Sequence, residues 1–179
     1  AIHASMRAAA RSLEELAAPK DVVWEVWAQA CNADYVANLQ ASTIKDLPAD
    51  TERGLVDMHS VIATVQKHLP DDAVLTNGAG NFATWVHRFW PFRQFGTQLA
   101  PTSGSMGYGL PAGMGAQRLW PDRTVVVFAG DGDFLMHGQE FATAVQYRLP
   151  IIVVLLDNGM YGTIRMHQER EYPHRVSGT

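Results

Sequence analysis

Two apolar runs of the sequence end in polar side chains that could together bind a divalent cation. The run Val125–Gly130 leads directly into Asp131, and the run 151–156 leads into Asp157 and Asn158. Carboxylate and amide oxygens suit magnesium or calcium better than zinc. Magnesium commonly takes one or two carboxylates and completes its shell with other oxygens, including those of phosphates. The residue types alone therefore indicate a magnesium site beside a phosphate or diphosphate.

The first of these strand ends also has the backbone character of an anion site. Gly130 and Gly132 let a ligand approach the main chain closely. The N–H groups of Gly132, Asp133 and Phe134 would begin the next helix, and a helix N-terminus favours an anion. Gly-Asp-Gly also occurs in ordinary strand-to-helix turns, so the alternative for this motif alone is a turn without a ligand.

A regular alternation of helices and strands positions these residues. Apolar periodicity and cap residues predict the helices, and short apolar runs between turns predict the strands. The predicted helices span 57–69 (with Asp57 as the cap), 82–89, 103–120 (entered through a Gly-rich turn) and 134–148. The predicted strands span 73–77, 123–130 and 150–157, and 160–171 is a last helix or loop. Strands that are apolar on both faces predict an α/β fold, with a parallel sheet flanked by helices on both faces and ligands at the carboxyl ends of the strands.

The first part of the chain differs from the rest. Residues 5–18 and 20–41 are predicted to form two helices, the second with Asp21 as its cap, and the residues after them are polar and rich in turn formers. We therefore expect residues 1–54 to be an approach segment or linker from a preceding domain, and residues 55–179 to be one domain.

Composition argues against several classes of protein. The 179 residues are 47% hydrophobic and 18% charged, which allows a packed core. The formal net charge of −4 does not favour a surface for nucleic acid or anionic membranes. The single cysteine, Cys31, cannot form an internal disulfide, and no apolar run is long enough to cross a bilayer. We expect a soluble cytoplasmic protein without nucleic-acid or membrane partners.

A resemblance to a known family covers most of the second part. Gly130-Asp131-Gly132, followed by a helix, a strand and Asp157-Asn158, resembles the thiamine-diphosphate signature of Gly-Asp-Gly and a later Asn-Asn. The stretches PTSGSMGYGLPAGMGAQ and NGAGNFATW are similar to segments of acetolactate-synthase-type enzymes, and the resemblance covers about residues 55–170. It implies the thiamine-diphosphate-binding fold of their C-terminal, diphosphate-binding domain, here truncated at its C-terminus, with thiamine diphosphate and Mg²⁺ as cofactors.

The resemblance implies roles for individual residues. Asp131 and Asn158 would bind Mg²⁺ through their side chains, and Met160 through its carbonyl. Gly104 and Met106 would be the catalytic pair: the Gly104 carbonyl would accept a hydrogen bond from the aminopyrimidine, and Met106 would be the wedge that bends the cofactor. The alternative for Met106 is a core methionine at a helix entry. The implied cofactor-binding set is Gly80, Asn81, Phe82, Gly104, Met106, Gly130, Asp131, Gly132, Asp133, Phe134, Asn158, Met160, Tyr161 and Gly162.

Some positions depart from the family pattern. Asp157 replaces the first Asn of the pair, and its carboxylate either repels a bound diphosphate or points into the sheet and is hydrogen-bonded. His167 stands where acetolactate synthases carry a tryptophan, and Ile164 where pyruvate-decarboxylase-type enzymes carry a catalytic glutamate, so neither specificity pattern is matched. His137 and Glu140 are either acid–base groups or a helix face near the site.

The resemblance also implies an enzyme, a lyase or transferase acting on a 2-oxo acid. Decarboxylation would be followed by protonation or by attack on a second carbonyl compound, with the cofactor as electron sink. In this family the activating glutamate comes from a pyrimidine-binding domain of the same or another subunit, and residues 1–54 are too short to supply it. We expect a homodimer or homotetramer, and an inactive isolated chain. The alternatives are a non-catalytic cofactor-binding fragment and a separate diphosphate-binding subunit of a two-subunit 2-oxo acid decarboxylase.

Overall fold

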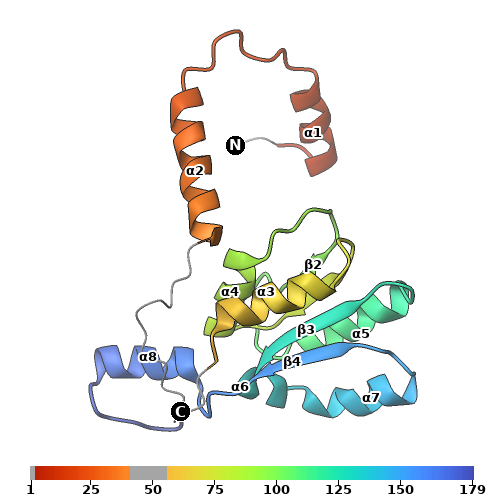
Figure 1. Cartoon of the computed structure of the whole chain (residues 1–179), viewed down its shortest axis with the longest axis vertical. Coiled ribbons are helices and arrows are strands. Elements are labelled where there is room, and N and C mark those ends of the chain that lie inside the picture. Colours follow the sequence, from red (N-terminus) through yellow and green to blue (C-terminus); the bar gives the residue numbers. More distant parts are fainter. Residues whose placement is uncertain (1–2, 41–55) are drawn as a thin grey trace. The chain divides into compact units, whose positions relative to one another are not determined.

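The computed structural model describes residues 3–40 and 56–179. The chain forms two compact units, Ala1–Ala41 and Ser42–Thr179. The first unit contains helices α1 (Met6–Glu14) and α2 (Glu25–Gln40), drawn in red and orange in Figure 1. No helix within the described residues is long and apolar enough to cross a membrane.

Helix α2 begins later than the sequence predicts. Asp21 is the predicted cap, but the first helical residue is Glu25. The Val22 carbonyl accepts a hydrogen bond from the Glu25 N–H at 3.2 Å, which forms a tight turn before the helix. β-Branched valine is a weak helix former, whereas the Glu25 carboxylate accepts a hydrogen bond from Gln29 Nε2 at 3.1 Å one turn on. The prediction of Asp21 as the cap is therefore wrong.

The second unit is a parallel sheet with helices on both faces (Figure 1). Its four strands lie in the order β2-β1-β3-β4, and every pair is parallel. The elements in chain order are α3 (Met58–His68), β1 (Val74–Asn77), α4 (Asn81–Phe89), β2 (Gln98–Leu99), α5 (Gly109–Leu119), β3 (Val125–Gly130), α6 (Asp131–Leu135), the 3₁₀ turn η2 (Gly138–Glu140), α7 (Phe141–Gln146), β4 (Ile152–Leu156) and α8 (Gly162–Glu171). The predicted α/β fold is confirmed.

Strand β3 illustrates why the apolar runs are continuous. Val126 and Phe128 pack with side chains of α3 and α4 on one face of the sheet. Val125 and Val127 pack with side chains of α5 and α7 on the other face. Each of these four residues is at most 1% exposed. Burying such a side chain contributes about 1.5–3 kcal/mol, so both faces of the strand stabilise the fold.

Helix α3 begins where the sequence predicts. Asp57 is its N-cap, and its carboxylate accepts hydrogen bonds from the His59 N–H at 2.9 Å and from the Ser60 hydroxyl at 2.5 Å. The Ser60 hydrogen bond is the main reason that the pKa of Asp57 lies below its ordinary value. A capped first turn thus fixes the start of α3.

The segment predicted as one helix over 134–148 is broken in the structure. α6 ends at Leu135, and α7 begins only at Phe141. His137, between them, has φ −138° and ψ 22°, outside the helical region. Its ring Nδ1 instead bonds to the Gly107 carbonyl at 3.0 Å. The single-helix prediction is therefore wrong, because a tertiary contact outweighs the local periodicity; the two-residue strand β2 is likewise not predicted by the sequence pattern.

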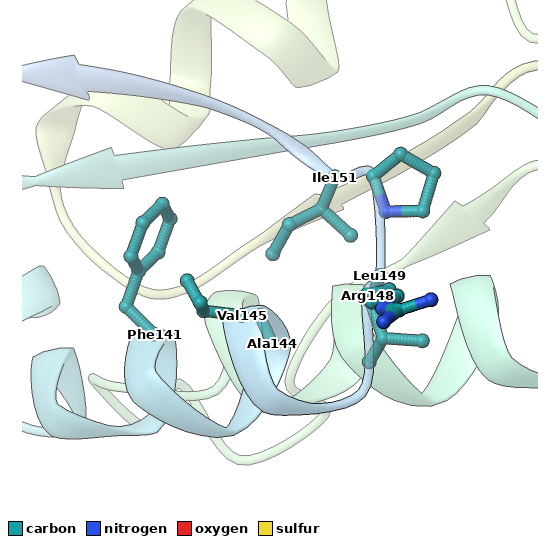
Figure 2. A pocket seen from close by; sticks show the side chains of 7 residues that line it. Phe141, Ala144, Val145, Arg148, Leu149 and Ile151 are labelled. Carbon is teal, nitrogen blue, oxygen red and sulfur yellow. The ribbon is translucent and has the colours of Figure 1, made fainter.

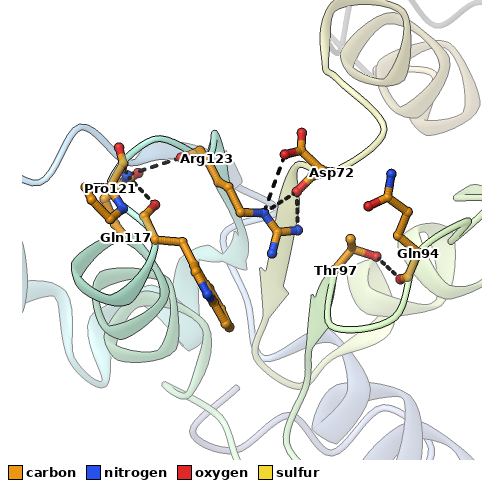
Figure 3. A network of polar contacts seen from close by, with 7 residues as sticks. Asp72, Gln94, Thr97, Gln117, Pro121 and Arg123 are labelled. Atoms are coloured by element: carbon orange, nitrogen blue, oxygen red, sulfur yellow. Dashed lines mark hydrogen bonds and ion pairs between the residues drawn. The ribbon is translucent and has the colours of Figure 1, made fainter.

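Polar contacts fix the loops at the amino-terminal edge of the sheet (Figure 3). The Arg123 guanidinium donates to the Asp72 carbonyl from Nε at 2.6 Å and also from Nη2, which joins the loops before β3 and β1. Gln117 is buried, and its Nε2 donates to the carbonyls of Trp120 at 3.4 Å, Pro121 at 3.1 Å and Arg123 at 3.2 Å. These contacts anchor the start of the strand that leads to the Gly-Asp-Gly motif.

Candidate functional site

The polar strand ends predicted from the sequence lie along one edge of the sheet. Gly130, at the end of β3, pairs in register with Leu156, at the end of β4. Adjacent parallel strands are ~4.8 Å apart. Asp131 directly follows β3 and Asn158 follows β4, so the structure brings these two chain segments to the same edge.

Asp131 is a half-buried carboxylate at the first position of α6. Gly130 is the N-cap of this helix, with an extended backbone (φ −75°, ψ 161°). Within the described residues the Asp131 side chain has no hydrogen bond and no ion pair. Burial penalises a charge that has no partner, so this carboxylate is suited to a cation. The first-turn N–H groups of Gly132 and Asp133 have no acceptor within a helix and are suited to an anion.

The loop after β4 is built from two successive side-chain turns. Asp157 Oδ1 accepts a hydrogen bond from the Gly159 N–H at 2.9 Å, and Asn158 Oδ1 accepts one from the Met160 N–H at 3.1 Å. The Asp157 carboxylate is thus hydrogen-bonded. Because Asp157 is exposed, this carboxylate does not point into the sheet. The Asn158 oxygen keeps a second lone pair for a ligand. The Met160 carbonyl accepts a hydrogen bond from the Gly162 N–H at 3.0 Å.

Close packing at two glycines joins the loops to one another. A Cβ on Gly132 would lie 2.6 Å from the Tyr161 ring, so this ring packs directly on the glycine backbone. A Cβ on Gly130 would lie 3.1 Å from the Phe82 ring, which comes from α4. The Gly-Asp-Gly turn is therefore in contact with Tyr161, which follows β4, and with Phe82 of α4.

Asp133 is a buried carboxylate that contacts both neighbouring loops. It is 3% exposed, and its Oδ1 accepts hydrogen bonds from the Gly107 N–H at 2.7 Å and the Ala79 N–H at 3.2 Å. Burial raises the pKa of the Asp133 carboxyl, and these two hydrogen bonds oppose the rise. The sequence predicts only a backbone role for Asp133, so this side-chain role is missed. The glycines at 78 and 107 are the signal that could have revealed it.

The loop before α5 contains the predicted catalytic pair. Gly104 is exposed and has φ +68°, a left-handed conformation that favours glycine. Met106 is half-buried, and Gly107 after it is buried with φ +80°. The Gly107 carbonyl accepts the hydrogen bond from His137 Nδ1. The loop is thus held firmly at Gly107.

The turn after β1 lies beside these loops. Gly80 is the N-cap of α4 and has φ +152°. The exposed Asn81 accepts a hydrogen bond at Oδ1 from the Thr163 hydroxyl at 3.0 Å, which ties the start of α4 to the start of α8. Phe82 is half-buried against Gly130. The three residues predicted as a second diphosphate loop therefore adjoin the turns after β3 and β4.

The side chains considered for specificity and acid–base chemistry make local contacts. His167 is exposed on α8, and its Nδ1 accepts a hydrogen bond from Arg170 Nη2 at 3.0 Å. Glu140 Oε2 accepts a hydrogen bond from the Thr143 hydroxyl at 2.9 Å. Ile164 is exposed on the same helix as His167. The contacts of His167 and Glu140 are thus local, whereas His137 contacts the Gly107 carbonyl in the loop before α5.

A hollow of about 320 Å³ lies away from this edge (Figure 2). It is lined by Phe141, Ala144, Val145, Arg148, Leu149, Pro150 and Ile151. Because Ile151 precedes β4, the hollow lies toward the amino end of that strand, opposite the polar strand ends. It is therefore separate from the candidate site.

The donor set fits magnesium together with a diphosphate. The Asp131 carboxylate, which has no partner among the described residues, an amide oxygen and a main-chain carbonyl are hard donors, and they are few enough to leave positions for phosphate oxygens. In the part of the chain that the structure describes, no three His, Cys, Asp or Glu side chains gather into a metal-binding cluster. The available groups thus suit a cation that takes the rest of its shell from a ligand.

Sequence comparisons identify proteins that are similar to this chain. The family model "Thiamine pyrophosphate enzyme, C-terminal TPP binding domain" matches residues 78–179. The acetolactate synthase large subunit of Lactococcus lactis subsp. lactis is 36% identical over 118 residues, which are 65% of this chain and 20% of that protein. The acetolactate synthase large subunit of Corynebacterium glutamicum is 35% identical over 150 residues, which are 82% of this chain and 23% of that protein.

A solved structure is also similar. The thiamine diphosphate-dependent 4-hydroxybenzoylformate decarboxylase of Rhodococcus jostii RHA1 matches with a TM-score of 0.63 and 31% identity, over 69% of this chain and 23% of that one. The chain thus spans between a fifth and a quarter of the length of these relatives. Since the family match covers more than half of it, the chain belongs to the thiamine pyrophosphate enzymes and contains their C-terminal cofactor-binding domain.

Proposed function

We propose that this chain binds the diphosphate of thiamine diphosphate together with Mg²⁺. The observation that carries the proposal is the half-buried carboxylate of Asp131 at the end of β3, which has no partner among the residues that the structure describes. β3 lies next in the sheet to β4, the strand that leads to Asn158. The metal ligands would be the side chains of these two residues and the carbonyl of Met160. Each is an oxygen donor of the kind that magnesium prefers.

The diphosphate would be held by main-chain groups around the same edge. Its donors would be the N–H groups of Gly132, Asp133 and Phe134, at the start of α6. The other residues proposed to contact the cofactor are Gly80, Asn81, Phe82, Gly130, Tyr161 and Gly162. The contacts of Phe82 with Gly130 and of Tyr161 with Gly132 support a shared binding surface.

The loop before α5 would orient the other end of the cofactor. The Gly104 carbonyl would accept a hydrogen bond from the aminopyrimidine, and the Met106 side chain would support a bent cofactor. Bound thiamine diphosphate would supply an electron sink for the loss of carbon dioxide from a 2-oxo acid. The residues of this chain would then bind, orient and bend the cofactor, and they would not supply a catalytic acid or base.

The complete protein would be a lyase or transferase that decarboxylates or carboligates a 2-oxo acid. The names of the relatives, acetolactate synthase and 4-hydroxybenzoylformate decarboxylase, support this substrate class. We place residues 55–179 in the diphosphate-binding domain and residues 1–54 in a segment that leads to it. A pyrimidine-binding domain of the same or another subunit would supply the activating glutamate, in a homodimer or homotetramer. The single cysteine is in keeping with a cytoplasmic location.

Two alternatives share the cofactor site but differ in catalysis. The chain could be a non-catalytic cofactor-binding fragment, or the separate diphosphate-binding subunit of a two-subunit decarboxylase. Turnover of a 2-oxo acid after addition of a pyrimidine-binding partner would favour the subunit over the fragment. Turnover by the 179-residue chain alone would contradict the need for a partner domain.

Removing the charge of Asp131 is expected to weaken cofactor binding. In Asp131→Asn the carboxylate becomes a neutral amide of the same size, so the dissociation constant for thiamine diphosphate in the presence of Mg²⁺ should rise at least about tenfold, or ~1.4 kcal/mol. Calorimetric titration measures this change. Asp122→Asn, an exposed substitution in the α5–β3 loop at the amino-terminal edge, is the matched control and should bind like the wild type. Unchanged binding by Asp131→Asn would refute the proposed metal site.

A further inference from the structure

Asp133 reaches from α6 to two separate loops with one oxygen atom. Its Oδ1 accepts the N–H of Gly107, before α5, and the N–H of Ala79, after β1. The carboxylate lies directly against Gly78, where a Cβ would come 1.9 Å from Oδ1. Only a residue without a side chain at 78 leaves room for it. The turn after β1 and the loop before α5, which both adjoin the candidate site, therefore converge on this carboxylate.

His137, one turn further along, makes a second contact with the same loop. Its Nδ1 lies 3.0 Å from the Gly107 carbonyl, and because a carbonyl can only accept, Nδ1 carries the proton. A Cβ on Gly107 would lie 2.4 Å from this Nδ1, and the φ of +80° also requires glycine. Both polar main-chain groups of Gly107 are thus held by side chains of the segment 133–137.

We propose that Asp133 and His137 form a two-point clamp on Gly107, and that this clamp positions Met106 relative to the turn after β3. The inference rests on the proposed function, in which Met106 supports the bent cofactor and the turn after β3 holds its diphosphate. The Gly107 N–H belongs to the Met106–Gly107 peptide, so fixing it fixes the main chain from which the Met106 side chain projects. The segment 133–137 then sets the distance between the two parts of the chain that hold the two ends of the cofactor.

Packing alone does not require a carboxylate at position 133. Burying a carboxylate between two neutral N–H donors is destabilising relative to a neutral side chain of similar shape, because the charge loses its hydration. A single oxygen that reaches two amides is needed only if both loops must be fixed to the same point. Asp133 and His137 are therefore positioning residues, which act on the cofactor through the Gly104–Gly107 loop.

Hydrogen exchange of single amides tests the clamp on the 179-residue chain without any cofactor. Asp133→Ala removes the acceptor, so the protection of the Ala79 and Gly107 amides should fall at least about tenfold, while β3 amides such as Val127 keep theirs. Asp133→Asn keeps an Oδ1 and should restore protection to within about threefold of the wild type. Equal losses at all three amides would show a purely global effect and overturn the clamp, as would full protection in Asp133→Ala.

Cofactor binding tests the positioning role separately. In His137→Ala and Asp133→Ala, the affinity for thiamine diphosphate should fall at least about threefold more than the affinity for inorganic diphosphate, both measured with Mg²⁺. Gln139→Ala, an exposed substitution in η2 two residues after His137, should change neither affinity. Equal losses for both ligands would overturn the positioning role. If the wild-type chain binds neither ligand, the proposed function fails, and the exchange experiment alone decides whether the clamp exists.

Discussion

Gly78→Ala is expected to lower the free energy of unfolding by at least about 3 kcal/mol. The added Cβ would lie 1.9 Å from Oδ1 and 2.4 Å from Cγ of Asp133, distances that no real contact tolerates. The carboxylate cannot withdraw without losing its hydrogen bonds to Ala79 and Gly107, and both N–H groups would then lack a partner. Chemical denaturation followed by circular dichroism measures the change.

A double-mutant cycle assigns this effect to the contact with Asp133. Asp133→Ala removes the three atoms that a Cβ at 78 would meet first. The double variant should therefore be at least about 2 kcal/mol more stable than the sum of the two single effects predicts. Strict additivity would mean that Gly78 is required for a reason other than this carboxylate, and a fully stable Gly78→Ala would contradict the packing described here.

Gly113→Ala should lower the free energy of unfolding by the next largest amount, about 2–4 kcal/mol. Gly113 lies where α5 crosses the sheet, and a Cβ there would come 2.5 Å from Val127 Cγ2 and 3.1 Å from Thr76 Oγ1. α5 would have to move away from β3, and the Thr76 hydroxyl would lose its 2.8 Å hydrogen bond to the Gly109 carbonyl. Equilibrium denaturation in urea gives the change in stability.

The same helix offers the control. Gly115 is exposed on α5 and has no atom within 4 Å of an added Cβ. Gly115→Ala should therefore stabilise the protein by up to about 1 kcal/mol, as alanine does in an exposed helix. Opposite signs at two positions of one helix separate tertiary packing from helix propensity. If both substitutions stabilise, α5 does not lie as close to the sheet as the structure places it.

The sequence predicts the framework of the second unit well, for a physical reason. Strands such as Val125–Gly130 are buried on both faces, so their apolar runs are continuous, and the capped or periodic helices between them stand out. Because the connections are parallel, the chain returns to the same edge after each helix. This is why Asp131 and Asn158, far apart in the sequence, could be expected at one edge.

The rest depends on contacts between distant residues, which no local pattern encodes. The break near His137 follows from its bond to Gly107, thirty positions earlier, and not from its own segment. The buried carboxylate of Asp133 is visible only once Gly78 and Gly107 are seen beside it. Asp21 is misassigned because the sequence offers a capping residue but not the competing turn at Glu25. Local sequence patterns predict which helices and strands form, whereas hydrogen bonds between distant residues decide where those elements end.

The most direct test of the central claim compares three ligands of the 179-residue chain in the presence of Mg²⁺. Titration calorimetry with thiamine diphosphate, inorganic diphosphate and thiamine separates the two ends of the cofactor. If the chain holds the diphosphate through Asp131 and the turn after β3, thiamine diphosphate and inorganic diphosphate will both bind, and chelation of Mg²⁺ will abolish binding. Thiamine will not bind at concentrations that saturate thiamine diphosphate. Binding of thiamine as tight as that of thiamine diphosphate, or binding that survives removal of the metal, would contradict the account.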